Sequence, residues 1–374
     1  MGCGTKNSSD VISKLDNKLK KADSYYVTGV MNIINNEDTY TYDVEISYKK
    51  DNYYKIDLTN KLNNHEQVIL RNDDGVYVVT PSLNKSFKFQ SDWPYNNSQV
   101  YLFGSIINDL KDDKNMTFKD NGKGYVLKSL VNYPNNKSLA KQNVYVDDKM
   151  NITKVEVTDK NNKVQISMKF DKAKFNKKFD KDYFELSNLI SISDKKSNNN
   201  NSTDNNNTDN SNQNTNGNGS DTSTSEESST NNSNIQNKEN NTTDSNNNQT
   251  NTEKKNTEQT ATIDDVIYPM YLPDNTTLAN KEVVDTGSGQ RLILTFEGDS
   301  PFILVEETAK YQDNGLVVPV SGELDFLTDV IGVINDNSLT WESNGIEYYL
   351  VSDTIKTAEL IEIAQSINVL PVSK

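Results

Sequence analysis

The feature that most constrains the fold is a series of short strand patterns between residues 25 and 170. About ten segments rich in β-branched and aromatic residues are separated by turn sequences such as Asn-Gly-Lys-Gly and Asp-Lys-Asn-Asn. Strands joined by such short turns pair antiparallel, because a parallel pair needs a crossover of about a dozen residues. In residues 40–48, apolar or aromatic side chains alternate with polar ones, so one face of the sheet is buried. The expected strands are residues 25–34, 40–48, 53–58, 68–71, 76–80, 86–89, 116–119, 125–130, 142–146, 152–158 and 163–170.

Two helices are available to cover the apolar face of this antiparallel meander. The first spans residues 10–22 with Asp10 as its cap, and the second spans residues 98–110 with Asn97 or Ser98 as its cap. The sheet must curl around them, which predicts a mainly antiparallel β half-barrel with covering helices. Its interior is either filled or forms an apolar groove. Eight tyrosines are expected either to pack within the sheet or to line that groove: Tyr25, Tyr26, Tyr40, Tyr42, Tyr48, Tyr53, Tyr54 and Tyr77.

The chain divides by composition into two candidate domains. Residues 187–260 are almost entirely polar and predict a disordered Asn/Ser/Thr-rich linker, with an aggregation-prone polar tract as the weaker alternative. The domains expected are a tether at 1–7, the half-barrel at 8–186, the linker, and a small α+β domain at 261–374. The last should contain a helix opened by Asp353 and its own strands at 291–296, 302–306, 316–320, 339–342 and 346–351.

The charge distribution and the single cysteine limit the partners and the covalent or metal sites that the chain can have. Residues 261–374 carry 19 acidic and 5 basic side chains, so nucleic acid is not an expected partner. Cys3 is the only cysteine, which excludes an intramolecular disulfide and a multi-cysteine metal site. Gly2-Cys3 followed by a polar tether resembles the end of a bacterial lipoprotein signal, which predicts lipid attachment at Cys3 and a membrane anchor outside the cytoplasm. The alternative is a free terminal thiol.

No residue pattern predicts an enzyme, a metal site or a cofactor. His65 is the only histidine, so any serine or cysteine triad would depend on it, and a structural role is the favoured interpretation. The paired aspartates fall at turns without the alternating ligands of a calcium loop. The candidate partner-binding residues are Trp93, Tyr95, Tyr77 and His65, and for Trp93 a place in the core is the competing prediction.

Residues 8–186 resemble the lipoprotein carriers of the LolA/LppX/RseB type, and more narrowly the clostridial spore-germination lipoproteins of the GerS type. The resemblance is carried by DNYYKIDL, NHEQVILRNDDGVYVVTPSLNKSFKFQSDWP and VYVDDKMNITKVEV. It implies a half-barrel closed by helices. It also implies a lipoprotein that binds and licenses the amidase acting on spore-cortex peptidoglycan, rather than a catalyst.

The C-terminal segment resembles a domain of unknown function common in Firmicute lipoproteins and anti-sigma-factor proteins, the DUF4367 type. The matching strings are YPMYLP, LILTFEGDSPFILVEE and LTWESNGIEYYLVSD. The leading hypothesis is therefore a noncatalytic, membrane-anchored protein that docks a cell-envelope amidase. The alternatives are a carrier of lipid or lipoprotein acyl chains and, third, a sensor of the anti-sigma type. A filled interior favours docking, and an open apolar cavity favours carriage.

Overall fold

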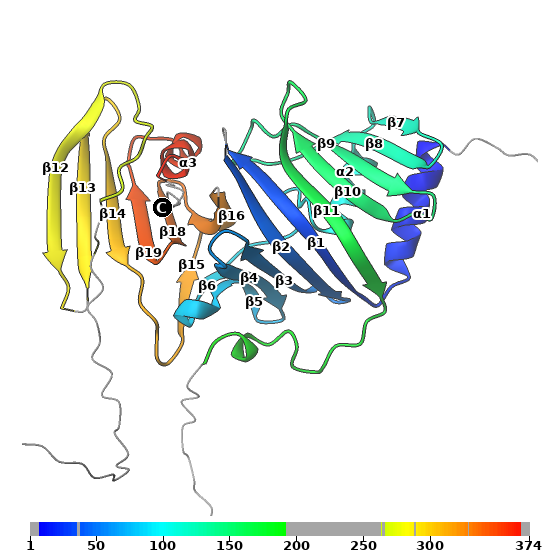
Figure 1. The fold of residues 1–374 in the computed structure, drawn as a ribbon, viewed down its shortest axis with the longest axis horizontal. Helices are drawn as coiled ribbons and strands as arrows, with labels where there is room; N and C mark the ends of the chain where they lie inside the picture. The colour runs from blue at the N-terminus through cyan, green and yellow to red at the C-terminus, as the bar shows by residue number, and fades with distance from the viewer. Residues whose placement is uncertain are drawn as a thin grey trace, which may run out of the picture. The chain divides into compact units, whose positions relative to one another are not determined.

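Two β-sheets and three α-helices make up the computed structural model, which describes residues 7–35, 38–191, 263, 266–287, 289–327 and 329–367 (Figure 1). The predicted lipidation site, Cys3, and almost all of the predicted linker lie outside the described residues. None of the helices in these ranges is long and apolar enough to cross a membrane. The described parts of the N-terminal and C-terminal segments belong to one compact unit.

The first sheet is the predicted half-barrel. It has 12 strands in the order β15-β6-β5-β4-β3-β2-β1-β11-β10-β9-β8-β7. Neighbouring strands pair antiparallel except at the β15 edge. Its N-terminal strands are β1 (Ser24–Asn35), β2 (Asp38–Lys49), β3 (Tyr53–Asn60), β4 (Glu66–Asn72), β5 (Gly75–Thr80), β6 (Lys85–Phe89), β7 (Thr117–Asp120), β8 (Gly124–Leu130), β9 (Lys141–Asp147), β10 (Ile152–Thr158) and β11 (Val164–Phe175). All eleven predicted strands are confirmed, with boundaries shifted by a few residues.

Alternation along the strands places the core. In β2, Tyr40, Tyr42, Val44 and Ile46 are buried, while the alternate residues Thr41, Asp43 and Glu45 are exposed or half-buried. Burial at every second residue puts these side chains on the face toward the helices. Over β4 and β5 the opposite face is also covered, because residues 179–190, which include the short 3₁₀ helix η2 (Leu186–Asn188), pack on Val68, Leu70 and Tyr77. A second 3₁₀ helix, η1 (Pro81–Leu83), joins β5 to β6.

The two covering helices form as predicted, but their caps differ. Helix α1 (Ser8–Lys20) is capped by Asn7 rather than Asp10. Asn7 accepts a hydrogen bond from the Asp10 N–H, and Asp10 accepts one from the Asn7 N–H, which makes a capping box. Helix α2 (Phe103–Asp112) begins after Leu102, so capping by Asn97 or Ser98 is wrong. The Ser98 hydroxyl instead accepts a hydrogen bond from the N–H of Asn132.

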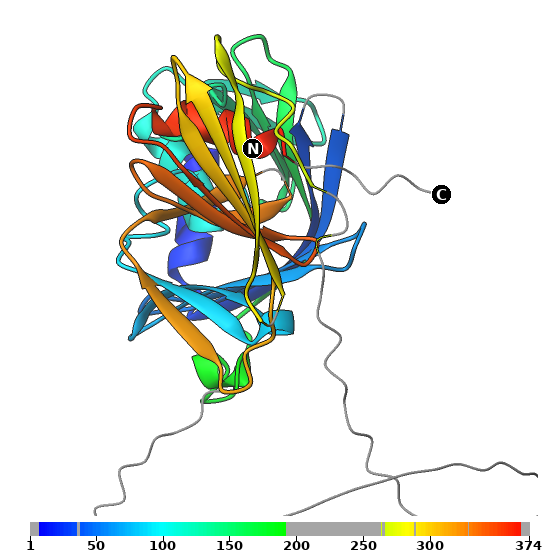
Figure 2. The same cartoon turned by 90° about the vertical axis from the view of Figure 1, so that its left-hand side faces the viewer.

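The second sheet belongs to the C-terminal segment and has seven strands in the order β12-β13-β14-β19-β18-β17-β16, with α3 (Thr357–Gln365) packed on one face (Figures 1 and 2). Its strands are β12 (Thr276–Asp285), β13 (Gln290–Gly298), β14 (Phe302–Thr308), β16 (Glu323–Leu327), β17 (Val330–Ile334), β18 (Ser338–Ser343) and β19 (Ile346–Val351). The prediction that Asp353 opens the helix is wrong. The Ser352 hydroxyl accepts from the N–H groups of Thr354 and Ile355, and this turn precedes α3.

One predicted strand of the C-terminal domain lies in the other sheet. Strand β15 (Leu316–Val320) pairs in parallel with β6 at the edge of the half-barrel, so the expectation that it belongs to the C-terminal domain's own sheet is wrong. Pro319 lacks an N–H donor, and an edge strand tolerates such a residue because only one side is paired. The C-terminal segment thus extends the half-barrel sheet by one strand.

Candidate functional site

Bulky side chains fill the concave side of the half-barrel. Tyr25 stacks on Tyr48 with ring centroids 4.8 Å apart, and Phe103 of α2 lies 5.5 Å from Tyr25 and 5.0 Å from Phe170. Ile106 and Leu110 of α2 are at most 1% exposed. The predicted amphipathic face of α2 is therefore used in full to fill the space between helix and sheet.

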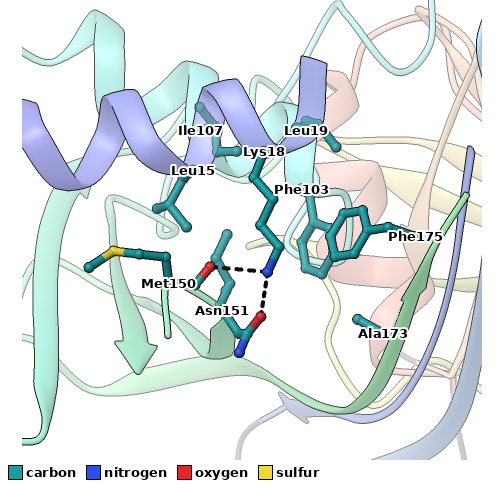
Figure 3. A pocket seen from close by; sticks show the side chains of 10 residues that line it. Leu15, Lys18, Leu19, Phe103, Ile107, Met150, Asn151, Ala173 and Phe175 are labelled. Carbon is teal, nitrogen blue, oxygen red and sulfur yellow. Dashed lines mark hydrogen bonds between the residues drawn. The ribbon is translucent and has the colours of Figure 1, made fainter. Parts of the chain in front are cut away.

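The cavity that remains beneath the helices is small. It measures about 30 Å³ and is lined mainly by apolar side chains of α1, α2 and the sheet (Figure 3). The ammonium group of Lys18 enters it, donates to the carbonyl of Met150 and the side chain of Asn151, and lies 4.8 Å from the centre of the Phe175 ring. Pockets for small organic ligands typically measure about 300–1,000 Å³. This cavity holds a few water molecules at most.

Five of the eight tyrosines are packed inside the fold, which was the first of the two predicted roles. Tyr25, Tyr40, Tyr42, Tyr54 and Tyr77 are buried in side-chain packing. Tyr25, Tyr48 and Tyr54 also border an open hollow of about 320 Å³ beside the end of α1. Asp16, Lys20 and Lys50 line the same hollow, so its charged rim does not suit an acyl chain.

The C-terminal domain completes the half-barrel core. Leu324, Ile331 and Val333 from β16 and β17 are at most 4% exposed and belong to the same apolar cluster as the barrel interior. The side chain of Phe326 packs on that cluster, and its ring is steeply inclined to that of Tyr101, with centroids 6.4 Å apart. Strands β16 and β17 were not predicted from the sequence. Strand β17 is buried at every residue and therefore shows no alternation of apolar and polar side chains.

Polar contacts fix this closure. Gln67 of β4 accepts a hydrogen bond from the N–H of Ile331 at 2.6 Å and donates to its carbonyl at 3.1 Å. Lys85 of β6 pairs with Glu347 of β19 at 2.6 Å. Leaving the buried amide of Gln67 without hydrogen bonds would cost free energy. Its two hydrogen bonds to Ile331 therefore favour one position of the C-terminal domain on the half-barrel.

His65 faces the C-terminal domain. Its Nε2 lies 3.4 Å from Oε2 of Glu342, and both side chains are largely buried. Burial lowers the pKa of His65, partly opposed by Asp329 and Glu66. Burial also raises the pKa of Glu342 to about 7, against a hydrogen bond from the N–H of Gly345. His65 therefore contributes to the junction between the two segments.

Two of the other predicted partner-binding residues are buried. The side chain of Trp93 is 0% exposed, lies edge-on to Tyr54 at 5.7 Å, and belongs to the main core. Tyr77 is 4% exposed and is covered by the segment around Phe184. Trp93 thus occupies the core position that was the competing prediction, and neither side chain is presented at the surface.

Tyr95 is the one predicted partner-binding residue with an accessible side chain, at 56% exposure. Its hydroxyl donates to Asn52, and the guanidinium of Arg71 lies 5.5 Å from the ring centre. These contacts hold an exposed aromatic ring in one orientation, which lowers the entropy lost when a partner binds it.

Buried carboxyl groups make stability depend on pH. Burial raises the pKa of Glu306, which is 0% exposed, to about 7, although the N–H of Ile267 donates to it. Because the folded chain holds this proton more tightly than the unfolded chain, the stabilisation is complete below about pH 4.5 and is lost as pH rises through 7. Glu306→Gln is therefore expected to raise the free energy of unfolding by about 1–3 kcal/mol at pH 8 and to change it little at pH 5.

Thermal unfolding at the two pH values measures this effect, with Glu307→Gln on the same strand as the control. Burial opposes the ionisation of Glu307, but hydrogen bonds from Arg291 and Lys310 outweigh it and lower its pKa. The control should not gain stability at pH 8. An equal gain for both variants would contradict the assignment to Glu306.

The described residues contain no group of three His, Cys, Asp or Glu side chains placed to hold a metal ion. His65 lies beside the Glu342 side chain at the junction with the C-terminal domain, with Nε2 3.4 Å from Oε2.

The chain is similar in sequence to a known protein family and aligns with several solved structures. A family model described as "Sporulation protein YdcC-like" matches residues 1–184. Sporulation protein YdcC from Bacillus subtilis (strain 168) is 32% identical over 365 residues, which cover 97% of this chain and 91% of the relative. Among solved structures, the MucA/MucB complex of Pseudomonas aeruginosa matches 96% of this chain and 98% of the other at 12% identity and a TM-score of 0.31. One chain from the structure of the CwlD amidase of Clostridioides difficile in complex with the GerS lipoprotein aligns over 45% of this chain and 96% of its own length, at 19% identity and a TM-score of 0.20.

Proposed function

Because the chain belongs to the family of YdcC-like sporulation proteins, we propose that it acts in spore formation as a noncatalytic protein that binds a cell-envelope enzyme. The observation that carries this proposal is the filled half-barrel. Its apolar interior is taken up by aromatic side chains and α2, and the C-terminal domain supplies Leu324, Ile331 and Val333 to the same core. An interior used in this way leaves the outer surfaces for binding.

The partner we propose is a peptidoglycan amidase, specifically one that acts on the spore cortex. Support comes from the resemblance of the β3–β6 and β9–β10 sequences to the GerS-type lipoproteins. In the same proposal the chain lies outside the cytoplasm, anchored to a membrane by lipid at Cys3, and a role in germination follows from the amidase. The C-terminal domain, which resembles the DUF4367 type, stabilises the half-barrel that the amidase contacts.

The docking residue we propose is Tyr95, together with Arg71. Tyrosine and arginine are enriched among the residues that contribute most to protein interfaces. Here they support each other on the surface through a cation–π contact. The other two aromatic candidates act indirectly, Trp93 within the half-barrel core and Tyr77 beneath the segment around Phe184.

The test is capture of the amidase from sporulating cells by the full chain, quantified by mass spectrometry. We expect the wild-type chain to recover an amidase in stoichiometric amount and Tyr95→Ala to reduce recovery at least about tenfold, as expected for loss of an interface hot spot. Tyr349→Ala is the matched control, because Tyr349 is 42% exposed on the C-terminal sheet. Recovery of no amidase, or equal loss with both variants, would contradict the proposal.

A further inference from the structure

A second hollow lies where the half-barrel meets the C-terminal domain. It measures about 360 Å³ and is bordered by the ends of β1 and β11, the loop before β9, β16 and α3. Its size falls in the range of small-ligand sites, which often lie between domains. Gln67 and His65, which contact the C-terminal domain, do not line this hollow, so its side chains are free to bind a ligand.

Side-chain amides are frequent in the lining of this hollow. Asn35, Asn135, Asn136, Gln165 and Gln365 line it from four different elements. Asn35 donates to the backbone carbonyl of Gln365 at 3.5 Å, which links β1 to α3. Within the described part of the chain, the side chains of Gln165 and Gln365 make no hydrogen bond of their own. Two amide groups, each able to donate and to accept, are thus left free at one site.

Apolar and aromatic side chains form the remaining walls. Tyr133 and Phe326 contribute rings, and Ile33, Ile166 and Ile361 contribute aliphatic surface. Mixed walls of this kind suit a ligand with both apolar faces and polar edges.

The charges at the hollow argue against an anionic ligand. Lys137 is the only cationic side chain in the lining, and it is opposed by Asp325 and Glu362. Asp325 is already held by the N–H of Phe326 at 2.8 Å. A phosphate or nucleotide would require clustered cations, which are absent from this lining.

The backbone at the hollow also limits the ligand class. Strands β1 and β11 are each paired on both sides, so neither offers a free edge to an extended peptide, whereas β16 is the edge strand of the second sheet. The side chains free to bind a ligand are amides, which favour groups that both donate and accept. Hydroxyl and acetamido groups have the same dual character.

We propose that this amide-lined hollow binds a neutral saccharide bearing hydroxyl and acetamido groups, with Gln165 and Gln365 as its polar contacts. The chemistry is that of the N-acetylated sugars in glycan strands. The inference does not depend on docking of an amidase, because it concerns the isolated chain.

The test is a calorimetric titration of the purified full chain with the β-1,4-linked tetramer of N-acetylglucosamine. We expect saturable binding, weaker binding of the glucose tetramer that lacks acetamido groups, and at least a tenfold loss of affinity in the double variant Gln165→Ala/Gln365→Ala. Both glutamines are half-exposed, so the variant should fold, and its melting temperature checks this. Gln90→Ala is the matched control, because Gln90 is exposed outside the hollow.

Three results would overturn the proposal. The first is the absence of saturable binding at millimolar saccharide. The second is unchanged affinity in a folded double variant. The third is equal affinity for the glucose tetramer, which would remove the acetamido assignment.

Discussion

Trp93→Ala is expected to lower the free energy of unfolding by about 3–5 kcal/mol, the usual cost of removing a large buried aromatic side chain. The indole is 0% exposed and packs edge-on against Tyr54. The residue is also held through its backbone, since its N–H donates to Ser91 at 3.1 Å and its carbonyl accepts from Arg71. Loss of the ring would leave a cavity in the centre of the half-barrel core.

Urea-induced unfolding measures this effect, and Tyr95→Ala supplies the control two residues away. Tyr95 is 56% exposed, so its truncation should cost less than about 1 kcal/mol. Such a difference separates the core role of Trp93 from the surface role of Tyr95. A cost below about 1 kcal/mol for Trp93→Ala would mean that the indole is not packed as described.

The second large effect is expected for Ile331→Asp, which places a carboxylate among the apolar side chains that close the half-barrel. Ile331 is 3% exposed, and its backbone forms both hydrogen bonds to Gln67. An unpaired buried charge costs about 3–5 kcal/mol, and separation of the two domains avoids this cost by exposing the carboxylate to water. We therefore expect the C-terminal domain to separate from the half-barrel.

Hydrogen exchange followed by mass spectrometry measures this separation. Faster exchange is expected in β4, β6 and β15, whereas β13, β14 and β19 should stay protected because their own core does not contain Ile331. Ile303→Asp is the matched control, because Ile303 is 39% exposed in β14. Gln67→Ala approaches the same junction from the half-barrel and should accelerate exchange in the same strands. Unchanged exchange in both junction variants would contradict the closure described here.

The half-barrel could be predicted from sequence because alternation and turn residues are local signals. Residues 40–48 show why: one side chain in two is apolar, and the strand buries that face. The helix caps could be predicted only in part. Asp10 does take part in the capping of α1, but as the partner of Asn7 rather than as the cap.

What the sequence did not reveal depends on contacts between distant segments. Nothing local in residues 316–320 indicates pairing with β6, and the ten-residue strand β12 is too polar and exposed to show a pattern. The roles of Trp93 and His65 likewise follow from their neighbours, Tyr54 and Glu342, which lie far along the chain. The amide-lined hollow is formed by side chains from four elements, and no spacing along the chain could indicate it.

The half-barrel is filled by the chain's own residues, and in the proposed function it binds a protein rather than carrying an acyl chain. Lipid analysis of the purified chain distinguishes these two roles. The full chain is purified from sporulating cells as the Cys3→Ser variant, so that no acyl group attached to Cys3 is counted, and is examined by native mass spectrometry and solvent extraction. We expect the mass of the polypeptide with no stoichiometric acyl lipid, and one acyl lipid bound per chain would contradict the proposed function.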